Sequence, residues 1–373
     1  MGVGHTSAAK AVALALDERR LDARIIDAYE HAVALFSRVA GAGYIRMVKT
    51  VPSLYGFLYD RVERAKEPGS LRKWLGTLSA RNLHRLIAEL DPSCVICTHA
   101  FPCGIMAQYK RTIDPSLPVV GVVTDYVVHP FWIYPNVDAY AVATDEMRST
   151  LISRGVEPGR VWVTGIPVDP RFALIPPKSQ ARHEVGVGNA QDRRLVLVMA
   201  GGLGIGPLET MLRGLVPLRD RVTAVVLTGK NARRRARLER WCAQWPFPVS
   251  IHGFEENVYD YMHAADLLLT KPGGLSVSEA LVARLPMVLV RPLGGQEQRN
   301  TRYLMERRAA FYASNEEEIA RAAHRLLERP GARRRILARA ETLRRPEAAA
   351  DVAEIVRDLI QREAPAVSAA GSR

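Results

Sequence analysis

The chain lacks the many cysteines of a disulfide-rich secreted domain and the long apolar runs of a membrane-spanning protein. Its 373 residues include four cysteines, fewer than the disulfide framework of a small secreted domain needs. No apolar run reaches the ~20 residues of a membrane-spanning helix. The chain also does not open with a basic segment followed by an apolar one, the pattern of a secretion signal. These absences predict a cytoplasmic protein that does not cross the membrane.

Aromatic residues are missing where positive charge is concentrated. The formal net charge is +13, and most of this excess lies after residue 170. Nucleic-acid binding needs a basic face with aromatic side chains between the charges, but the arginine runs 233–235 and 333–335 contain none. We therefore expect solvated helix faces there and no nucleic-acid partner. Contact with anionic lipid headgroups is the alternative.

Short apolar segments alternate with helical ones, which predicts parallel α/β sheets. The strands predicted in the first half are 23–27, 94–98, 119–124, 139–143 and 161–164. Those predicted in the second half are 195–200, 222–227, 249–251, 267–270, 287–290 and 310–312. The expected parts are a Rossmann-like domain at 1–168, a linker at 169–192, a second Rossmann-like domain at 193–346, a helix at 347–362 and a disordered tail at 363–373. Two such doubly wound domains normally face each other across a ligand-binding cleft.

The start of the chain departs from this pattern. Gly2 and Gly4 lead directly into the helix predicted at 6–18. A glycine turn of this kind usually follows the first strand of a doubly wound sheet. We therefore expect that the first strand of the N-terminal domain is missing from the chain as written.

The segment from Lys271 to Asn300 is the most informative part of the sequence. A predicted strand ends in the turn 272–274, and a helix is predicted to open at Ser276, with Glu279 three residues later. Glycines allow a ligand to approach the backbone, and a helix start suits phosphate. The following polar loop, 294–297, offers amide and carboxylate groups that suit sugar hydroxyls. The pattern therefore indicates a nucleotide-sugar site.

Two features of this segment have a simpler explanation. Ser276 and Glu279 fit a capping box, in which the carboxylate folds back onto the helix start. In that arrangement Glu279 is less free to bind a ribose. The loop 294–297 is equally typical of a solvated surface.

Polar, glycine and aromatic residues follow other predicted elements. His5 is either incidental to a glycine turn or a general base at a helix N-terminus, where the helix dipole favours the neutral imidazole that a base needs. Asp125 ends a buried strand, where it caps the next turn or orients a histidine. Gly201 and Gly202 follow a strand and form either a tight turn or a phosphate site. Phe254 belongs to the core or forms a wall for a base.

Several segments together resemble the monogalactosyldiacylglycerol synthase family, which includes bacterial processive diacylglycerol glucosyltransferases and is related to MurG. These segments are GVGHTSAAKAV, VVTDYVVHPFW, YAVATDEMRSTLISRGVEPGRVWVTGIPV, LVLVMAGGLG, LTGK, TKPGGLSVSEAL and GGQEQRNTRYL. The resemblance implies a GT-B fold, with the acceptor domain first and the donor domain second. It also implies that a hexose is moved from UDP-glucose or UDP-galactose to diacylglycerol or another lipid acceptor, with inversion. The enzyme would act at an anionic membrane surface, on the inner face of the cell membrane.

The resemblance also implies a role for each candidate residue. His5 would deprotonate the acceptor hydroxyl, with Asp125 close by. The acceptor side would further include Gly4, His129 and Trp132. The diphosphate would be surrounded by Gly201, Gly202, Gly273, Gly274 and Ser276. The rest of the donor site would be Phe254 beside the uracil, Glu279 on the ribose, Gln296 and Glu297 on the sugar, and Lys271 and Asn300.

The expected chemistry needs no metal and no cofactor. An inverting transfer is a single displacement that needs one base and a stabilised UDP leaving group. Backbone N–H groups and a helix dipole can neutralise the diphosphate. The second half of the chain contains no Asp-x-Asp motif of the kind that holds a metal.

Two further possibilities concern the lipid side. The segment 33–66 mixes aromatic and basic residues, which is typical either of a membrane-contacting helix or of a core helix. The damaged start also fits an inactive UDP-sugar-binding sensor. These alternatives stay open at the level of sequence.

Overall fold

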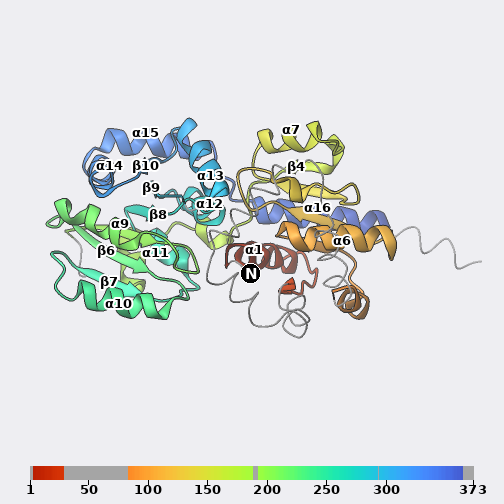
Figure 1. The fold of residues 1–373 in the computed structure, drawn as a ribbon, viewed down its shortest axis with the longest axis horizontal. Coiled ribbons are helices and arrows are strands. Elements are labelled where there is room, and N and C mark those ends of the chain that lie inside the picture. Colours follow the sequence, from red (N-terminus) through yellow and green to blue (C-terminus); the bar gives the residue numbers. More distant parts are fainter. Residues whose placement is uncertain (1–2, 29–82, 188–191, 293, 364–373) are drawn as a thin grey trace, which may run out of the picture. The chain divides into compact units, whose positions relative to one another are not determined.

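The computed structural model describes residues 3–28, 83–187, 192–292 and 294–363 (Figure 1). The chain forms two compact units. Of the described residues, those within 12–165 and 350–363 belong to the first unit, and those within 3–11 and 166–349 belong to the second. The possible membrane-contacting segment 33–66 and the tail expected after residue 363 lie outside the described residues.

The first unit is built on a parallel sheet with the strand order β1-β2-β3-β4. The strands are β1 (Val95–Cys97), β2 (Val119–Val122), β3 (Ala139–Val142) and β4 (Val161–Val163). Its helices include α6 (Ala100–Thr112) and α7 (Asp145–Ser153), whereas α1 (Val3–Asp17) begins in the second unit and ends in the first. Every residue of β2 and β3 is buried, as expected for parallel strands covered on both faces. Tyr140 on β3 donates its hydroxyl hydrogen to the Trp132 carbonyl at 2.8 Å.

The strand predicted at 23–27 is wrong. Residues 21–27 join neither sheet among the described residues, and Ile25 is exposed. A strand forms only when its backbone groups pair with a neighbour, and an apolar pattern cannot report whether a neighbour is present. The strand that the glycine pattern places before Gly2 stays a prediction.

The second unit contains a six-stranded parallel sheet with the order β10-β9-β8-β5-β6-β7. Its strands are β5 (Arg194–Met199), β6 (Val222–Leu227), β7 (Val249–His252), β8 (Leu267–Thr270), β9 (Met287–Val290) and β10 (Phe311–Ala313). Its longer helices are α9 (Leu208–Leu215), α10 (Ala232–Cys242), α12 (Gly274–Val282), α13 (Gly295–Glu306), α14 (Glu316–Glu328) and α15 (Pro330–Glu341). The chain runs outward from β5 to β7 and then returns to β8 on the other side of β5. In such a sheet, ligands bind beyond the carboxyl ends of the two strands where the order reverses.

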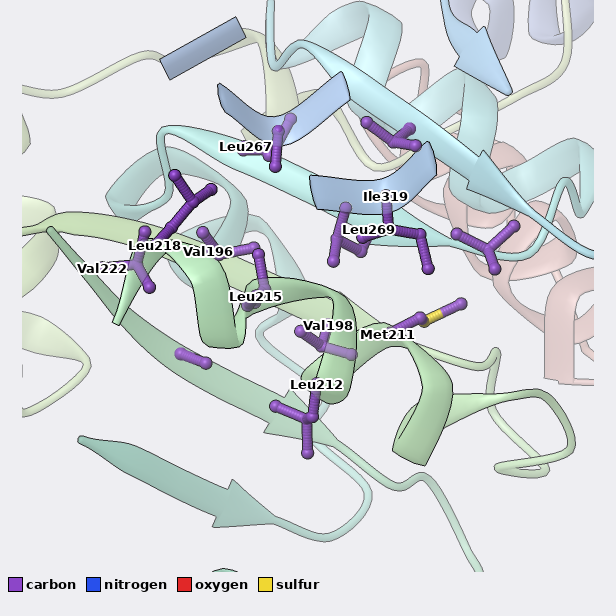
Figure 2. Close-up of a cluster of buried hydrophobic side chains, with 14 of the residues drawn as sticks. Val196, Val198, Met211, Leu212, Leu215, Leu218, Val222, Leu267, Leu269 and Ile319 are labelled. Atoms are coloured by element: carbon purple, nitrogen blue, oxygen red, sulfur yellow. The ribbon is translucent and has the colours of Figure 1, made fainter. Parts of the chain in front are cut away.

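One face of this sheet packs on α9 and α14 around a closed apolar cluster. Figure 2 shows Val198 and Leu269 from the strands together with Met211 and Leu215 of α9 and Ile319 of α14. All five are fully buried, and truncating one such leucine typically costs about 2–5 kcal/mol. This core fixes β5 and β8 side by side and thereby positions the turns that follow them.

The segment 169–192, where we expected a linker, contains a short helix that is pinned to the second unit. Lys178 of α8 (Lys178–Glu184) donates to the His263 carbonyl at 2.7 Å. Arg182 pairs with the buried Asp266 at 2.6 Å. The helix predicted at 347–362 forms as α16 (Ala348–Glu363). None of the described helices is both long and apolar enough to span a bilayer.

Candidate functional site

The predicted donor residues gather at the carboxyl edge of the second sheet. Gly201 and Gly202 follow β5, Lys271 and Gly273 follow β8, and these two strands are hydrogen-bonded neighbours. The sheet order reverses between them. The two glycine-containing turns therefore meet where a doubly wound sheet binds its ligand.

The turn after β5 has a backbone that depends on glycine. Gly201 and Gly204 have φ angles of 72° and 64°, in the left-handed region that other residues avoid. The turn also lies directly against the one after β6, where the Lys230 N–H donates to the Gly202 carbonyl at 2.9 Å. A Cβ added to Gly229 would lie 2.4 Å from that same carbonyl oxygen. The two turns are thus packed backbone to backbone, and Lys230 becomes part of the site.

Lys271 connects the glycine turn to helix α13. Its stem crosses Gly201, where an added Cβ would lie 2.9 Å from the Lys271 Cε. Its Nζ lies 2.8 Å from the Glu297 Oε1 in a largely buried ion pair. Asn300, which is fully buried, donates from Nδ2 to the Pro272 carbonyl at 3.0 Å. Asn300 therefore holds the turn after β8 in place.

Helix α12 begins two residues earlier than the sequence predicted. Its N-cap is Gly273, which makes no side-chain cap, and the Val277 N–H donates to the Gly273 carbonyl at 3.0 Å. Ser276 consequently lies inside the first turn, and Glu279 lies beyond it. The capping-box interpretation of Ser276 and Glu279 is therefore wrong, because the glycine turn itself continues into the helix. The N–H groups of Gly274 to Ser276 are therefore the first-turn donors that this helix start could offer to a ligand.

Glu279 has an unusual environment for a carboxyl group. Burial raises its pKa from the usual 4.5 to about 7, and the nearby Asp169 carboxylate acts in the same direction. A carboxyl group whose pKa lies near neutral pH is typical of a functional site.

The segment 294–297 is not a loop. Gly294 is the N-cap of α13, and the Gln298 N–H donates to the Gly294 carbonyl at 3.0 Å. Gln296 and Glu297 therefore lie in the first turn of a helix. Polar residues after two glycines suit a loop and a helix start equally well, which is why the pattern misled. A second helix N-terminus thus points to the same edge of the sheet.

Phe254 lies at this edge rather than in the core. It follows β7, and the residue is 40% exposed. The Lys230 Nζ lies 5.1 Å from the centre of the Phe254 ring, within cation–π range. Lys230 is the last residue of the LTGK segment, but the sequence analysis predicted no role for it. The signal was its position directly after a buried strand and a glycine.

Gly4 and His5 lie in the first turn of α1, which begins at Val3 rather than after His5. Residues up to Ala11 group with the second unit. A Cβ added to Gly202 would lie 2.4 Å from the Val3 Cβ, and one on Gly4 would lie 3.7 Å from the Leu275 Cβ. The turn that carries His5 therefore adjoins the glycine turn and the start of α12.

The remaining acceptor-side candidates lie in the first unit. Asp125 follows β2 and is half-buried. His129 is buried at the start of a short helical turn, where its Nδ1 accepts a hydrogen bond from the Phe131 N–H at 3.2 Å. Trp132 is also buried, so in this structure it packs in the protein interior. A meeting of Asp125 with His5, and contacts of all three residues with an acceptor, stay predictions.

Metal ligands are not assembled in the part of the chain that the structure describes. Within those residues, no group of three or more histidine, cysteine, aspartate or glutamate side chains is arranged to hold an ion. The expectation that transfer needs no metal stays a prediction.

Comparisons with known proteins confirm the resemblance that the motifs indicated. The model of the monogalactosyldiacylglycerol (MGDG) synthase family matches residues 5–168. A processive diacylglycerol beta-glucosyltransferase of Bacillus subtilis is 28% identical, over 80% of this chain and 77% of its own length. The protein of the same name from Bacillus cytotoxicus is 27% identical, over 95% and 90%.

Solved structures confirm the predicted GT-B fold. MurG of Acinetobacter baumannii is 15% identical, with a TM-score of 0.55 over 78% of this chain and 82% of its own. The UDP-GlcNAc 2-epimerase of Neisseria meningitidis, solved with UDP-GlcNAc, is 14% identical, with a TM-score of 0.56 over 96% and 97%. At such low identity these structures establish the fold alone.

Proposed function

We propose that this chain, which resembles the monogalactosyldiacylglycerol synthase family, is a glycosyltransferase that moves a hexose from a UDP-sugar to diacylglycerol. The observation that carries the proposal is the meeting of the Gly201 and Gly273 turns where the order of the second sheet reverses. The names of the relatives support the lipid acceptor. The expected location is the inner surface of the cell membrane.

The donor binds through its diphosphate. The first-turn N–H groups of α12 and the backbone at Gly201 and Gly202 are the donors that suit phosphate oxygens. The Lys271 ammonium lies beside Gly201 and pairs with Glu297, and it adds the positive charge that a helix end supplies only in part. These groups stabilise the charge that develops on the leaving UDP, so no metal is required.

The rest of the nucleotide sugar occupies the surrounding residues. Glu279 accepts hydrogen bonds from the ribose hydroxyls, and Phe254 flanks the uracil. Gln296 and Glu297, in the first turn of α13, bind the hexose hydroxyls. Since Glu297 is paired with Lys271, the diphosphate and the sugar are linked through one ion pair.

His5 acts as the general base. It takes the proton of the acceptor hydroxyl as that oxygen forms its bond to the anomeric carbon. The bond from this carbon to the phosphate oxygen breaks, and UDP leaves with the bonding electron pair. A single displacement of this kind inverts the anomeric configuration. Asp125 supports the base from the acceptor side.

The test is a donor-by-acceptor screen with the purified chain. Incubation with UDP-glucose or UDP-galactose and diacylglycerol micelles is expected to release UDP and form a glycolipid. Release of UDP with a different hydroxylated lipid would replace diacylglycerol but keep the reaction. Binding of UDP in a calorimeter, with no turnover on any acceptor, would favour an inactive sensor. No release and no binding with any UDP-sugar would overturn the proposal.

A further inference from the structure

Three successive arginines open helix α10, and the middle one differs from its neighbours. Arg233 and Arg235 are exposed, as the sequence predicted for a solvated helix face. The side chain of Arg234 is only 15% exposed. The solvated-face interpretation is therefore wrong for Arg234, and its burial needs a separate explanation.

Arg234 connects the glycine turn after β5 to helix α9. Its Nη1 donates to the Gly204 carbonyl at 2.7 Å, and its Nη2 lies 2.5 Å from the Glu209 Oε2. Gly204 closes the glycine turn, and Glu209 lies in the first turn of α9. One planar guanidinium thus ties the turn to the helix after it. Arginine suits this task because its fork of N–H groups is rigid.

The glycine turn packs on the turn after β6, where the Lys230 N–H donates to the Gly202 carbonyl, but it has few side-chain anchors of its own. Leu203 and Ile205, on either side of Gly204, are 49% and 44% exposed, so the turn is not anchored by burial of its own side chains. Gly204 itself sits so tightly that a Cβ would lie 2.0 Å from the Thr228 carbonyl oxygen. Gly204 is buried, so its carbonyl oxygen needs a hydrogen-bond partner, and Arg234 supplies one.

The contact to Glu209 is an ion pair at neutral pH. Partial burial alone would raise the pKa of Glu209. Its own backbone N–H and the neighbouring Arg234 and Arg237 outweigh this effect and lower that pKa. Both ends of the Arg234 bridge are therefore made by strong, charge-assisted hydrogen bonds.

We propose that Arg234 is a positioning residue for the nucleotide: it holds the turn from Gly201 to Gly204 in the shape that receives the diphosphate. Arg234 does not touch the ligand in this arrangement. Its positive charge is already taken up by Glu209, and it acts through the Gly204 carbonyl. The identity of the ligand rests on the proposed function, whereas the effect on the turn does not.

The test compares Arg234→Met with Arg233→Met, which changes the neighbouring exposed arginine in the same way. We expect Arg234→Met to weaken UDP binding about tenfold, the usual effect of losing a charge-assisted hydrogen bond, as measured by calorimetry. Hydrogen exchange of the backbone amides at 201–206 is expected to become faster. Arg233→Met is expected to match the unchanged chain in both measurements.

A second variant, Arg234→Lys, separates positioning from stability. A lysine still pairs with Glu209, which maintains folding, but one ammonium on a flexible stem does not reproduce the two-pronged contact. We expect its midpoint of thermal unfolding to stay near that of the unchanged chain, with UDP binding weakened and amide exchange accelerated. Unchanged exchange and unchanged UDP affinity in this variant would overturn the proposal, even if Arg234→Met does not fold. If the unchanged chain binds no UDP, the proposed function fails, and the exchange measurement alone decides the role of Arg234.

Discussion

The Lys271 Nζ lies 2.8 Å from the Glu297 Oε1, so one ion pair joins the end of β8 to the first turn of α13. The stem of Lys271 also crosses Gly201 after β5. A single lysine thus contacts the segments proposed for the diphosphate and for the hexose. Under the proposed function, we expect the phosphates of a bound nucleotide to compete with Glu297 for the lysine charge, which would make the carboxylate available to sugar hydroxyls.

Replacing Lys271 and replacing Glu297 are expected to have different effects on UDP binding and turnover. Lys271→Met removes the positive charge beside the diphosphate, and UDP binding should weaken by about tenfold or more. Glu297→Gln removes no charge that binds phosphate, so UDP binding should persist while turnover of the UDP-sugar falls. Calorimetry with UDP and initial rates with UDP-glucose measure the two effects.

A matched control lies on the same helix. Arg302 and Glu306 form an exposed pair at 2.7 Å on α13, and exposed pairs contribute little to stability. Arg302→Met should therefore leave binding and turnover unchanged. Equal losses in Arg302→Met and Lys271→Met would show that the effect is not specific to the donor site.

His5 is expected to act in the chemical step and not in donor binding. His5→Ala should lower kcat by about 10²- to 10⁴-fold, the usual contribution of a general base, while UDP affinity stays unchanged. His324→Ala, on the exposed face of α14, serves as the control. If His5→Ala retains the full rate, the base is another residue.

The pKa of Glu279, raised to about 7 by burial, makes nucleotide binding depend on pH. A ribose diol donates hydrogen bonds to the carboxylate, so UDP binding should strengthen as the pH rises, by up to about tenfold per unit below that pKa. Above the pKa, affinity should level off. Calorimetric titrations between about pH 6 and about pH 8 measure the slope.

Substitution of Glu279 tests the origin of this dependence. Glu279→Gln cannot ionise, so its UDP affinity should show no slope in this range, and Glu279→Ala should bind more weakly at every pH. The raised pKa of Glu279 also affects folding stability, which changes with pH in the opposite direction to UDP binding. Because the folded state holds the proton more tightly than the unfolded state, Glu279 lowers the free energy of unfolding as the pH rises from 4.5 to about 7. A slope that persists in Glu279→Gln would assign the dependence to another group.

Gly204 is expected to tolerate no side chain. Gly204→Ala places a Cβ 2.0 Å from the Thr228 carbonyl oxygen at a φ of 64°, so the free energy of unfolding should fall by about 2 kcal/mol or more. Gly159→Ala is the control, because its Cβ would meet nothing within 4 Å. Denaturant unfolding of both variants measures the difference. Equal stability of the two would mean that the turn adjusts freely.

Most strands could be predicted from the sequence, whereas the beginnings of the functional helices could not. Buried parallel strands such as β6 and β8 are continuous aliphatic runs, and the predicted bounds 222–227 and 267–270 match the structure. Helices α12 and α13 begin at glycines. Glycine is common both in turns and at helix starts, so the pattern does not reveal where the helix begins.

The amino-acid sequence by itself determined the two-sheet architecture and the order of the donor motifs, because aliphatic runs and glycine turns are local features of the chain. Only the tertiary structure decided three further points. Among the described residues, it left 23–27 outside both sheets, it paired Lys271 with Glu297, and it buried Arg234 while Arg233 and Arg235 stayed exposed. Each depends on groups that lie far apart along the chain or on which face of a helix meets the protein. No local pattern encodes such contacts.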